Sequence, residues 1–268
     1  MEEAIPEGGA LAHRYAITFG EVAITHAGAP EYGTGLRDHG FSVAELRELA
    51  SKLPGAELVS LNEALPKEYT SAPGANEEAA VLVMRAGAIT MLESASAPQE
   101  LLKEQDSIEY DRMFFDRGQT KHKRARHNLV FGDVAHSASS DYKQPSVCSF
   151  GELPLLNRFR QLLPKVLGAK AEGLFAEGNH YYDSTCGVGF HGDAERKIVI
   201  CLSLGASSTV RYQWRPPRSS TAVGKSVDIQ VHHGDVYVMS EKASGWDWKK
   251  RSKARLVHAA GAAKYIGS

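Results

Sequence analysis

The sequence predicts an α+β fold in which a mostly helical N-terminal layer supports a β sandwich or barrel. From about residue 171 onward, short β-forming runs alternate with Gly, Asp, Ser or Pro, as in KIVICLSLG (197–205) and STVRYQWR (208–215). Many short strands with regular turn signals are typical of sandwiches and barrels. We expect residues 1–106 to form the support layer and 107–268 the β domain, joined into one integrated unit.

Bulk properties place few limits on function. The 268 residues are 43% hydrophobic and 24% charged, as is ordinary for a globular protein. Because the net charge is only −1, the protein as a whole does not attract nucleic acid, and such binding would need a local basic patch. Three cysteines without CxxC spacing indicate free thiols in a reducing compartment. With no secretory signal and no run of about 20 apolar residues, we expect an intracellular protein, cytoplasmic or nuclear, with no membrane partner.

The first expected elements are a strand pair and a helix. Residues 15–26 (YAITFGEVAITH) alternate well enough for two short strands. Ser42 and Glu45 form a capping box, and Phe41 and Leu46 can form a hydrophobic staple. Leucines on one face continue this pattern until a Pro-Gly pair ends it. A packing helix without a catalytic role is the interpretation we favour here.

Three further elements precede the β domain or lie within it. The apolar segment 79–92 predicts a buried strand, or a hairpin around its central glycine. Residues 98–106 suggest a short helix. Segment 154–168 has leucine and phenylalanine at helical spacing, and Pro164 should interrupt or kink that helix.

Three residues in the β domain could hold a metal ion. His191 and Asp193 are two positions apart, so on a strand both side chains point to the same face. His258 lies in a later apolar strand pattern. Two imidazoles and one carboxylate on one face of an octahedral ion leave three positions open, as in Fe(II) oxygenases. A lone His-x-Asp is usually incidental, and a lone His is more often a core residue, so the surrounding motifs must add specificity.

Residues 120–262 resemble the AlkB-like branch of the 2-oxoglutarate- and Fe(II)-dependent dioxygenases. Seven short motifs follow one another in the order of that family. They are RARHNLVFGD (124–133), SFGELPLLNRFRQLL (149–163), Asn179-His180-Tyr181, GFHGDAER (189–196), IVICLSLG (198–205), HHGDVYVMS (232–240) and LVHAAG (256–261). The resemblance covers about half of the chain, and the N-terminal hundred residues have no counterpart in it.

The resemblance implies a double-stranded β-helix (jelly roll) oxygenase domain over residues 107–268. His191, Asp193 and His258 would be the catalytic residues and would bind Fe(II), while Asn179 and Tyr181 would contact 2-oxoglutarate. The implied reaction consumes O₂ and 2-oxoglutarate, releases succinate and hydroxylates a C–H bond, with ascorbate as an auxiliary reductant. Hydroxylation of an N-methyl group would release formaldehyde.

The chain departs from the family at the cation that pairs with the cosubstrate. AlkB-like proteins place arginines well downstream of the distal histidine, whereas here ten residues without arginine follow His258. A dianion in a partly buried site needs a cationic partner. Lys264, on an expected last strand, is the first candidate and Arg211 the second. Either residue could equally be a solvated surface base.

Basic residues before the matched motifs suggest a nucleic-acid substrate. The run 121–127 (KHKRARH) includes Arg124 and Arg126, which could hold phosphates, while Tyr182 or Trp214 could stack on an extruded base. The favoured substrate is therefore a modified base in DNA or RNA. Two alternatives stay open, namely oxidation of a protein side chain or small metabolite, and a non-catalytic β-barrel binding module. The intact ligand set argues against the second alternative, and a solvated loop is the simpler explanation of the basic run.

Overall fold

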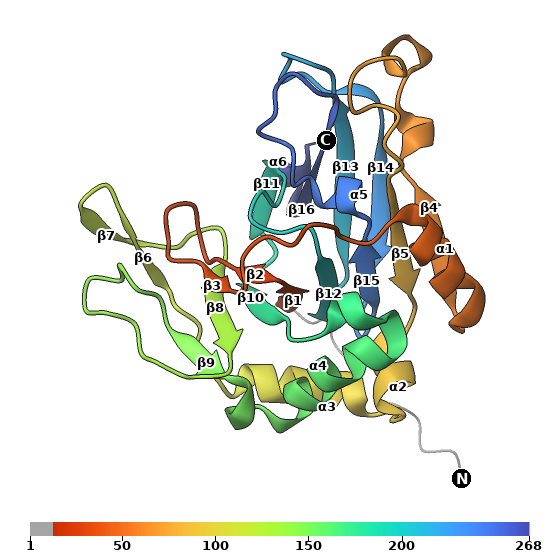
Figure 1. Cartoon of the computed structure of the whole chain (residues 1–268). Coiled ribbons are helices and arrows are strands. Elements are labelled where there is room, and N and C mark those ends of the chain that lie inside the picture. Colours follow the sequence, from red (N-terminus) through yellow and green to blue (C-terminus); the bar gives the residue numbers. More distant parts are fainter. Residues whose placement is uncertain (1–12, 268) are drawn as a thin grey trace.

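The computed structural model describes residues 13–267, so residues 1–12 of the expected N-terminal layer lie outside the described residues. The fold is mixed α/β and is dominated by one eight-stranded sheet (Figure 1). In sheet order its strands are β4 (Ala56–Ser60), β5 (Ala80–Met84), β15 (Val236–Met239), β12 (Val199–Gly205), β1 (Arg14–Gly20), β10 (Phe175–Tyr181), β8 (His127–Gly132) and β9 (Val147–Ser149).

A second sheet and two small hairpins complete the β structure. The four-stranded sheet has the order β11 (Gly187–His191), β16 (Arg255–Gly261), β13 (Ser208–Arg215) and β14 (Val223–Val231). The hairpins are β2 (Val22–Ala23) with β3 (Tyr32–Gly33), and β6 (Met113–Asp116) with β7 (Gln119–His122). The β6–β7 hairpin projects from the side of the molecule (Figure 1).

The helices are short and lie outside the sheets. They are α1 (Val43–Lys52), α2 (Gly87–Leu92), α3 (Ala97–Asp106), α4 (Pro154–Leu167), α5 (Glu241–Ser244) and α6 (Ala263–Ile266), with 3₁₀ turns at Asn62–Ala64, Lys67–Tyr69, Phe150–Glu152 and Ala169–Ala171. Among the helices of residues 13–267, none combines the length and the apolar character that crossing a bilayer requires.

The large sheet separates two hydrophobic cores, as the alternation along β12 shows. Ile200 and Leu202 point to the side where α2, α3 and α4 pack, below the sheet in Figure 1. Val199 and Cys201 point to the other side and share a core with the inward residues of the four-stranded sheet. The space between the two sheets is therefore where side chains from both can meet.

Helix α1 confirms the expected capping box. The Ser42 hydroxyl accepts a hydrogen bond from the Glu45 backbone N–H, and the Glu45 carboxylate accepts one from the Ser42 N–H at 2.7 Å. Phe41 and Leu46 are both buried in the core beneath the helix, consistent with the expected staple. The short helix expected over residues 98–106 is confirmed as α3. The interruption expected at Pro164 does not occur, because α4 continues through this residue.

The N-terminal region is not the mostly helical layer that the sequence suggested. It inserts β1 between β12 and β10, and it adds β4 and β5 at one edge of the large sheet. Residues 15–26 do contain two strands, β1 and β2, but these do not pair with each other, because β1 pairs with strands more than 150 residues away and β2 pairs with β3. In segment 79–92 the expected buried strand is confirmed as β5, and helix α2 follows it in place of the alternative hairpin.

Candidate metal centre

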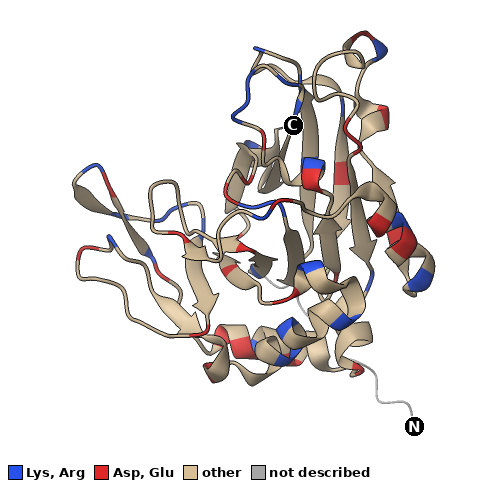
Figure 2. Cartoon of the chain, in the orientation of Figure 1, with Lys and Arg blue, Asp and Glu red and all other residues tan. Residues whose placement is uncertain are grey.

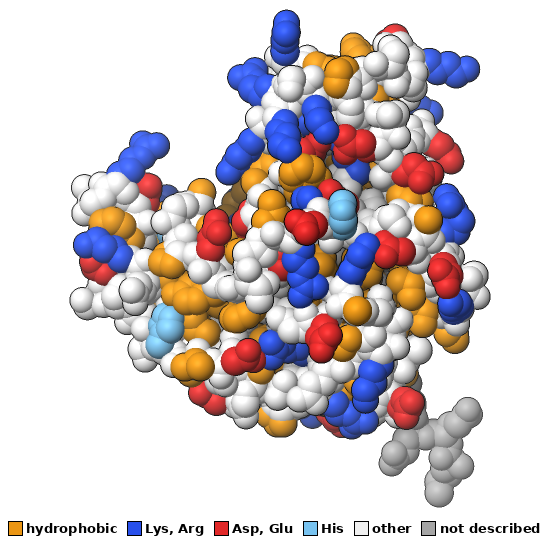
Figure 3. All heavy atoms as spheres, in the orientation of Figure 1, with side chains coloured by type: hydrophobic (Ala, Val, Ile, Leu, Met, Phe, Trp, Pro, Cys, Tyr) orange, Lys and Arg blue, Asp and Glu red, His pale blue; other side chains and the backbone are white. Residues whose placement is uncertain are grey.

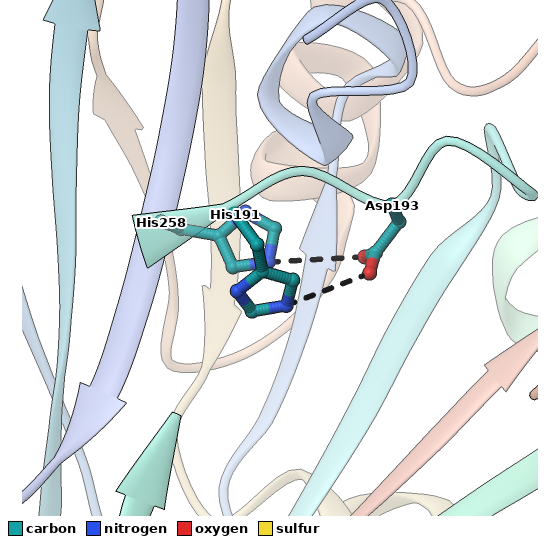
Figure 4. A group of neighbouring side chains, drawn as sticks. All are labelled: His191, Asp193 and His258. Carbon is teal, nitrogen blue, oxygen red and sulfur yellow. Dashed lines mark ion pairs between the residues drawn. The ribbon is translucent and has the colours of Figure 1, made fainter. Parts of the chain in front are cut away.

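The three predicted metal ligands come together on the four-stranded sheet. His191 is the last residue of β11, and it lies opposite His258 of the adjacent antiparallel strand β16. Asp193 follows two residues after His191, just beyond the strand end. Figure 4 shows the two imidazoles and the carboxylate facing one another.

The donor atoms are arranged for a shared cation. His191 Nε2 lies 3.8 Å from Asp193 Oδ1, and His258 Nε2 lies 3.8 Å from Asp193 Oδ2. One ligand atom from each residue can be chosen so that all lie within 4.8 Å of one another. Adjacent donors on an octahedral ion are about 3 Å apart, so small side-chain rotations would close the site.

Hydrogen bonding and burial prepare both imidazoles as ligands. The Nδ1–H of His191 donates to the Gly189 carbonyl at 2.8 Å, and this bond leaves the Nε2 lone pair facing Asp193. His258 is buried, and desolvation, followed by the neighbouring His191 and Arg196, holds its pKa well below the usual range. Both rings direct Nε2 toward the Asp193 carboxylate. This donor set fits iron(II) as well as other divalent transition metals.

The turn after β11 is held by close backbone packing. The Asp193 N–H donates to the Ser244 carbonyl at 2.9 Å. A Cβ at Gly192 would lie 2.3 Å from the Gly245 carbonyl oxygen and 2.8 Å from the Trp248 Cβ. The turn carrying Gly245 is itself fixed by a fully buried ion pair, Lys242 Nζ to Asp247 at 2.8 Å. Only glycine fits between the two metal-ligating residues.

We therefore expect Gly192→Ala to lower metal affinity by about 10- to 100-fold, the range seen when outer-shell partners are lost. The added methyl group would push the 191–193 backbone away from the 245–248 turn. Calorimetric titration of the purified protein with Mn(II) measures this. Gly189→Ala is the matched control, because a Cβ there meets no described atom within 4 Å. Equal affinity in wild type and Gly192→Ala would contradict the packing argument.

The triad opens into a cavity of about 910 Å³ between the two sheets. The four-stranded sheet contributes the triad together with apolar residues such as Val210 and Val231. The large sheet contributes polar side chains from β1, β10 and β12, including Arg14, Asn179, Tyr181 and Ser203. Apart from the ligands, the strands of the four-stranded sheet present apolar side chains to the cavity, whereas the facing wall carries groups that can bind a polar molecule.

Asn179 and Tyr181 lie in this cavity. Both are on the inner face of β10 and both are buried. The Asn179 side-chain oxygen accepts hydrogen bonds from Arg126 Nε and from Asn128 Nδ2, the latter at 2.8 Å. Its amide NH₂ is therefore the group with which it could bind a ligand.

The two predicted cosubstrate cations lie outside the cavity. Arg211 points away from it because residues of β13 alternate, with Val210 and Tyr212 facing inward. Its Nε and Nη2 pair with the two Asp228 oxygens at 2.7 Å each. Lys264 is exposed because the chain after β16 forms helix α6 instead of a last strand. Neither residue can pair with an anion at the triad.

Arg14, which the sequence analysis did not select, is a cation that lies in the cavity, whereas Arg211 and Lys264 lie outside it. It is only 7% exposed, it lines the cavity, and its guanidinium carbon lies 3.7 Å from the centre of the Tyr181 ring. Within residues 13–267 its Nη2 is buried and has no hydrogen-bond partner. Because β1 meets β10 only in the tertiary structure, local patterning could not have identified this residue.

Comparison with known proteins gives one clear relative. No known family profile matches the chain. An uncharacterized protein of Acanthamoeba polyphaga mimivirus is 36% identical over 258 residues, covering 93% of this chain and 96% of the viral protein. The chain belongs to the same family as this viral protein. The two proteins are similar over nearly their whole length.

The predicted substrate residues fall into two groups. Arg124 and Arg126 line the cavity. Tyr182 does not, because it follows inward-facing Tyr181 and its ring stacks on His127 at 4.4 Å. Trp214 is 1% exposed within the core between the sheets, where its Nε1–H donates to the Leu61 carbonyl at 2.8 Å. Neither aromatic side chain is placed to stack on a base in this cavity.

Proposed function

We propose that the chain is an Fe(II)- and 2-oxoglutarate-dependent dioxygenase with a double-stranded β-helix (jelly roll) fold of the AlkB-like type. The observation that carries the proposal is the convergence of two imidazole Nε2 atoms and one carboxylate at the wall of a large cavity. Three protein ligands on one side of an octahedral ion leave three positions for cosubstrate and oxygen. The packing of a four-stranded sheet against a larger one is compatible with this fold.

When bound, iron(II) would supply activation of O₂, with conversion of 2-oxoglutarate to succinate and CO₂ and insertion of one oxygen atom into a substrate C–H bond. Arg14 would pair with a cosubstrate carboxylate, because a buried guanidinium needs an anionic partner. Asn179 would donate its amide N–H to the same ligand, and Tyr181 would hold the guanidinium of Arg14 in place. Apolar side chains around the triad would exclude water from the reacting atoms.

The proposed substrate is a modified base in DNA or RNA. The support comes from the lining of the cavity, which includes Arg124, Arg126 and Lys249 together with the aromatic residue Trp248. Figure 3 shows a notch between the β6–β7 lobe and the rest of the molecule, and Figure 2 shows Lys and Arg on the loops above it. Cationic and aromatic side chains together are typical of single-stranded nucleic-acid sites.

Turnover assays test the proposal directly. We expect succinate release in the presence of Fe(II), 2-oxoglutarate and ascorbate when methylated oligonucleotides are supplied, and no release with His191→Ala. Parallel reactions with methylated nucleosides and peptides identify the substrate class. Oligonucleotide binding should weaken steeply with salt if phosphates are contacted. Failure of the wild-type protein to bind Fe(II) or Mn(II) would overturn the proposal.

A further inference from the structure

Lys123 is a further buried cation in the cavity, besides Arg14 and Arg196, and the proposed function assigns it no role. It follows the β6–β7 hairpin, and its backbone N–H donates to the Arg112 carbonyl at 2.8 Å. Its side chain lines the cavity together with Phe114 and His26, and the residue is only 9% exposed. In the part of the chain that the structure describes, its Nζ is buried without a hydrogen-bond partner.

The acidic groups near Lys123 are already occupied. Asp111 accepts hydrogen bonds from the Ser146 N–H and hydroxyl, both at 2.7 Å. Glu177 forms a buried ion pair with Arg196 at 3.0 Å and accepts from Asn128 at 3.1 Å. Burial lowers the pKa of Lys123 to about 8, against the opposing effects of Asp111 and Glu177. The ammonium is thus incompletely compensated, and a buried cation of this kind favours binding of an anion.

Arg14 and Lys123 are associated with different ends of strand β10. Glu177, Asn179 and Tyr181 occupy alternate positions on the cavity face of β10. Arg14 stacks on Tyr181 at one end, and Glu177, at the other, is the residue whose charge acts on Lys123. Four residues of strand span about 13 Å. The proposed function already pairs Arg14 with a cosubstrate carboxylate, so Lys123 is left for a different anion.

We propose that Lys123 binds an oxyanion of a second ligand, the primary substrate, and that this oxyanion is the phosphate of a nucleotide unit. The identity of the ligand at Arg14 rests on the proposed function, whereas the anion position at Lys123 does not. Phosphate is favoured because Arg124 and Arg126 line the same cavity and the rings of Phe114 and Trp248 offer stacking surfaces for a base.

Equilibrium binding to the full chain without added metal tests the proposal. Nucleoside monophosphates, the matching nucleosides and inorganic phosphate are titrated, with tryptophan fluorescence and calorimetry as readouts. We expect Lys123→Met to weaken monophosphate binding at least 10-fold and to leave nucleoside binding unchanged. Lys121→Met is the matched control, because Lys121 is an exposed residue of the same hairpin paired with Asp116. Lys123→Arg should retain binding.

The pH dependence of monophosphate affinity distinguishes a direct role of Lys123 in binding from a merely structural role. The charges of Asp111, Glu177 and Arg126 affect the pKa of Lys123. The charge of Lys123 in turn affects the pKa of His26 and of His127. Wild-type affinity for a monophosphate should fall as pH rises above about 8, because the ammonium then loses its proton. The Lys123→Arg variant should show no such fall. A trinucleotide that binds more tightly than the monophosphate would identify a strand as the source of the phosphate, and equal affinity would identify a free nucleotide.

Two results would overturn the inference. One is equal affinity of the wild type for nucleoside and monophosphate. The other is unchanged monophosphate binding in Lys123→Met. Neither result depends on metal, so a protein that binds no metal would refute the proposed oxygenase while leaving this test intact. Conversely, metal binding with no phosphate preference would refute only the role of Lys123.

Discussion

Asp193→Asn is expected to lower affinity for Fe(II) or Mn(II) by at least about 100-fold, beyond the usual loss when only an outer-shell partner is removed. The Asp193 carboxylate faces Nε2 of both His191 and His258, so it is the one group that both imidazoles share. An amide of the same shape cannot supply the negative charge that a divalent ion requires. Turnover should be lost together with metal binding.

The measurement compares thermal unfolding with and without metal. A ligand present at 100 times its dissociation constant stabilises the folded state by about 2.7 kcal/mol, and Asp193→Asn should lose most of this gain. Glu195→Gln is the matched control, because Glu195 lies in the same loop and pairs with Arg196 but is not one of the three ligands. Metal-dependent stabilisation that is equal in wild type and Asp193→Asn would contradict the assigned ligand set.

Arg14→Met is expected to weaken 2-oxoglutarate binding by about 10- to 100-fold or more, since hydrogen bonds to charged groups contribute about 1.5–3 kcal/mol. Metal affinity should stay unchanged, because Arg14 is not one of the metal ligands. The stability of the ligand-free protein should not fall, since an uncompensated buried charge is replaced by an apolar side chain of similar length. Calorimetric titration of 2-oxoglutarate into the Mn(II)-loaded protein without oxygen gives the affinity.

Two further variants make this prediction specific to Arg14. Arg211→Met breaks the pair with Asp228 on the outer face of β13, and Lys264→Met changes an exposed residue of α6. Both should bind 2-oxoglutarate like the wild type. If Arg211→Met or Lys264→Met weakens binding while Arg14→Met does not, the cation has been assigned to the wrong strand.

Local chemistry was readable from the sequence alone. The capping box of Ser42 and Glu45 predicted where α1 begins, because both hydrogen bonds of such a box form within four residues. The strand pattern after residue 171 predicted β11, β12, β13 and β16 for the same reason, since alternation is a property of a short segment. His191, Asp193 and His258 could be selected as metal ligands by residue type and spacing, and the tertiary structure does bring them together.

The tertiary structure alone decided which residues share the cavity with those ligands. Arg14 reaches it because β1 lies beside β10, a pairing between segments about 165 residues apart that no local pattern encodes. Lys264 lies outside it because the chain forms helix α6 after β16. Trp214 lies on the same face of β13 as Val210 but farther along the strand, where it is buried in the core between the sheets. Residue type and spacing therefore identified the metal ligands. The order of the strands, and the place of each side chain on its strand, determined which residues surround these ligands in the cavity.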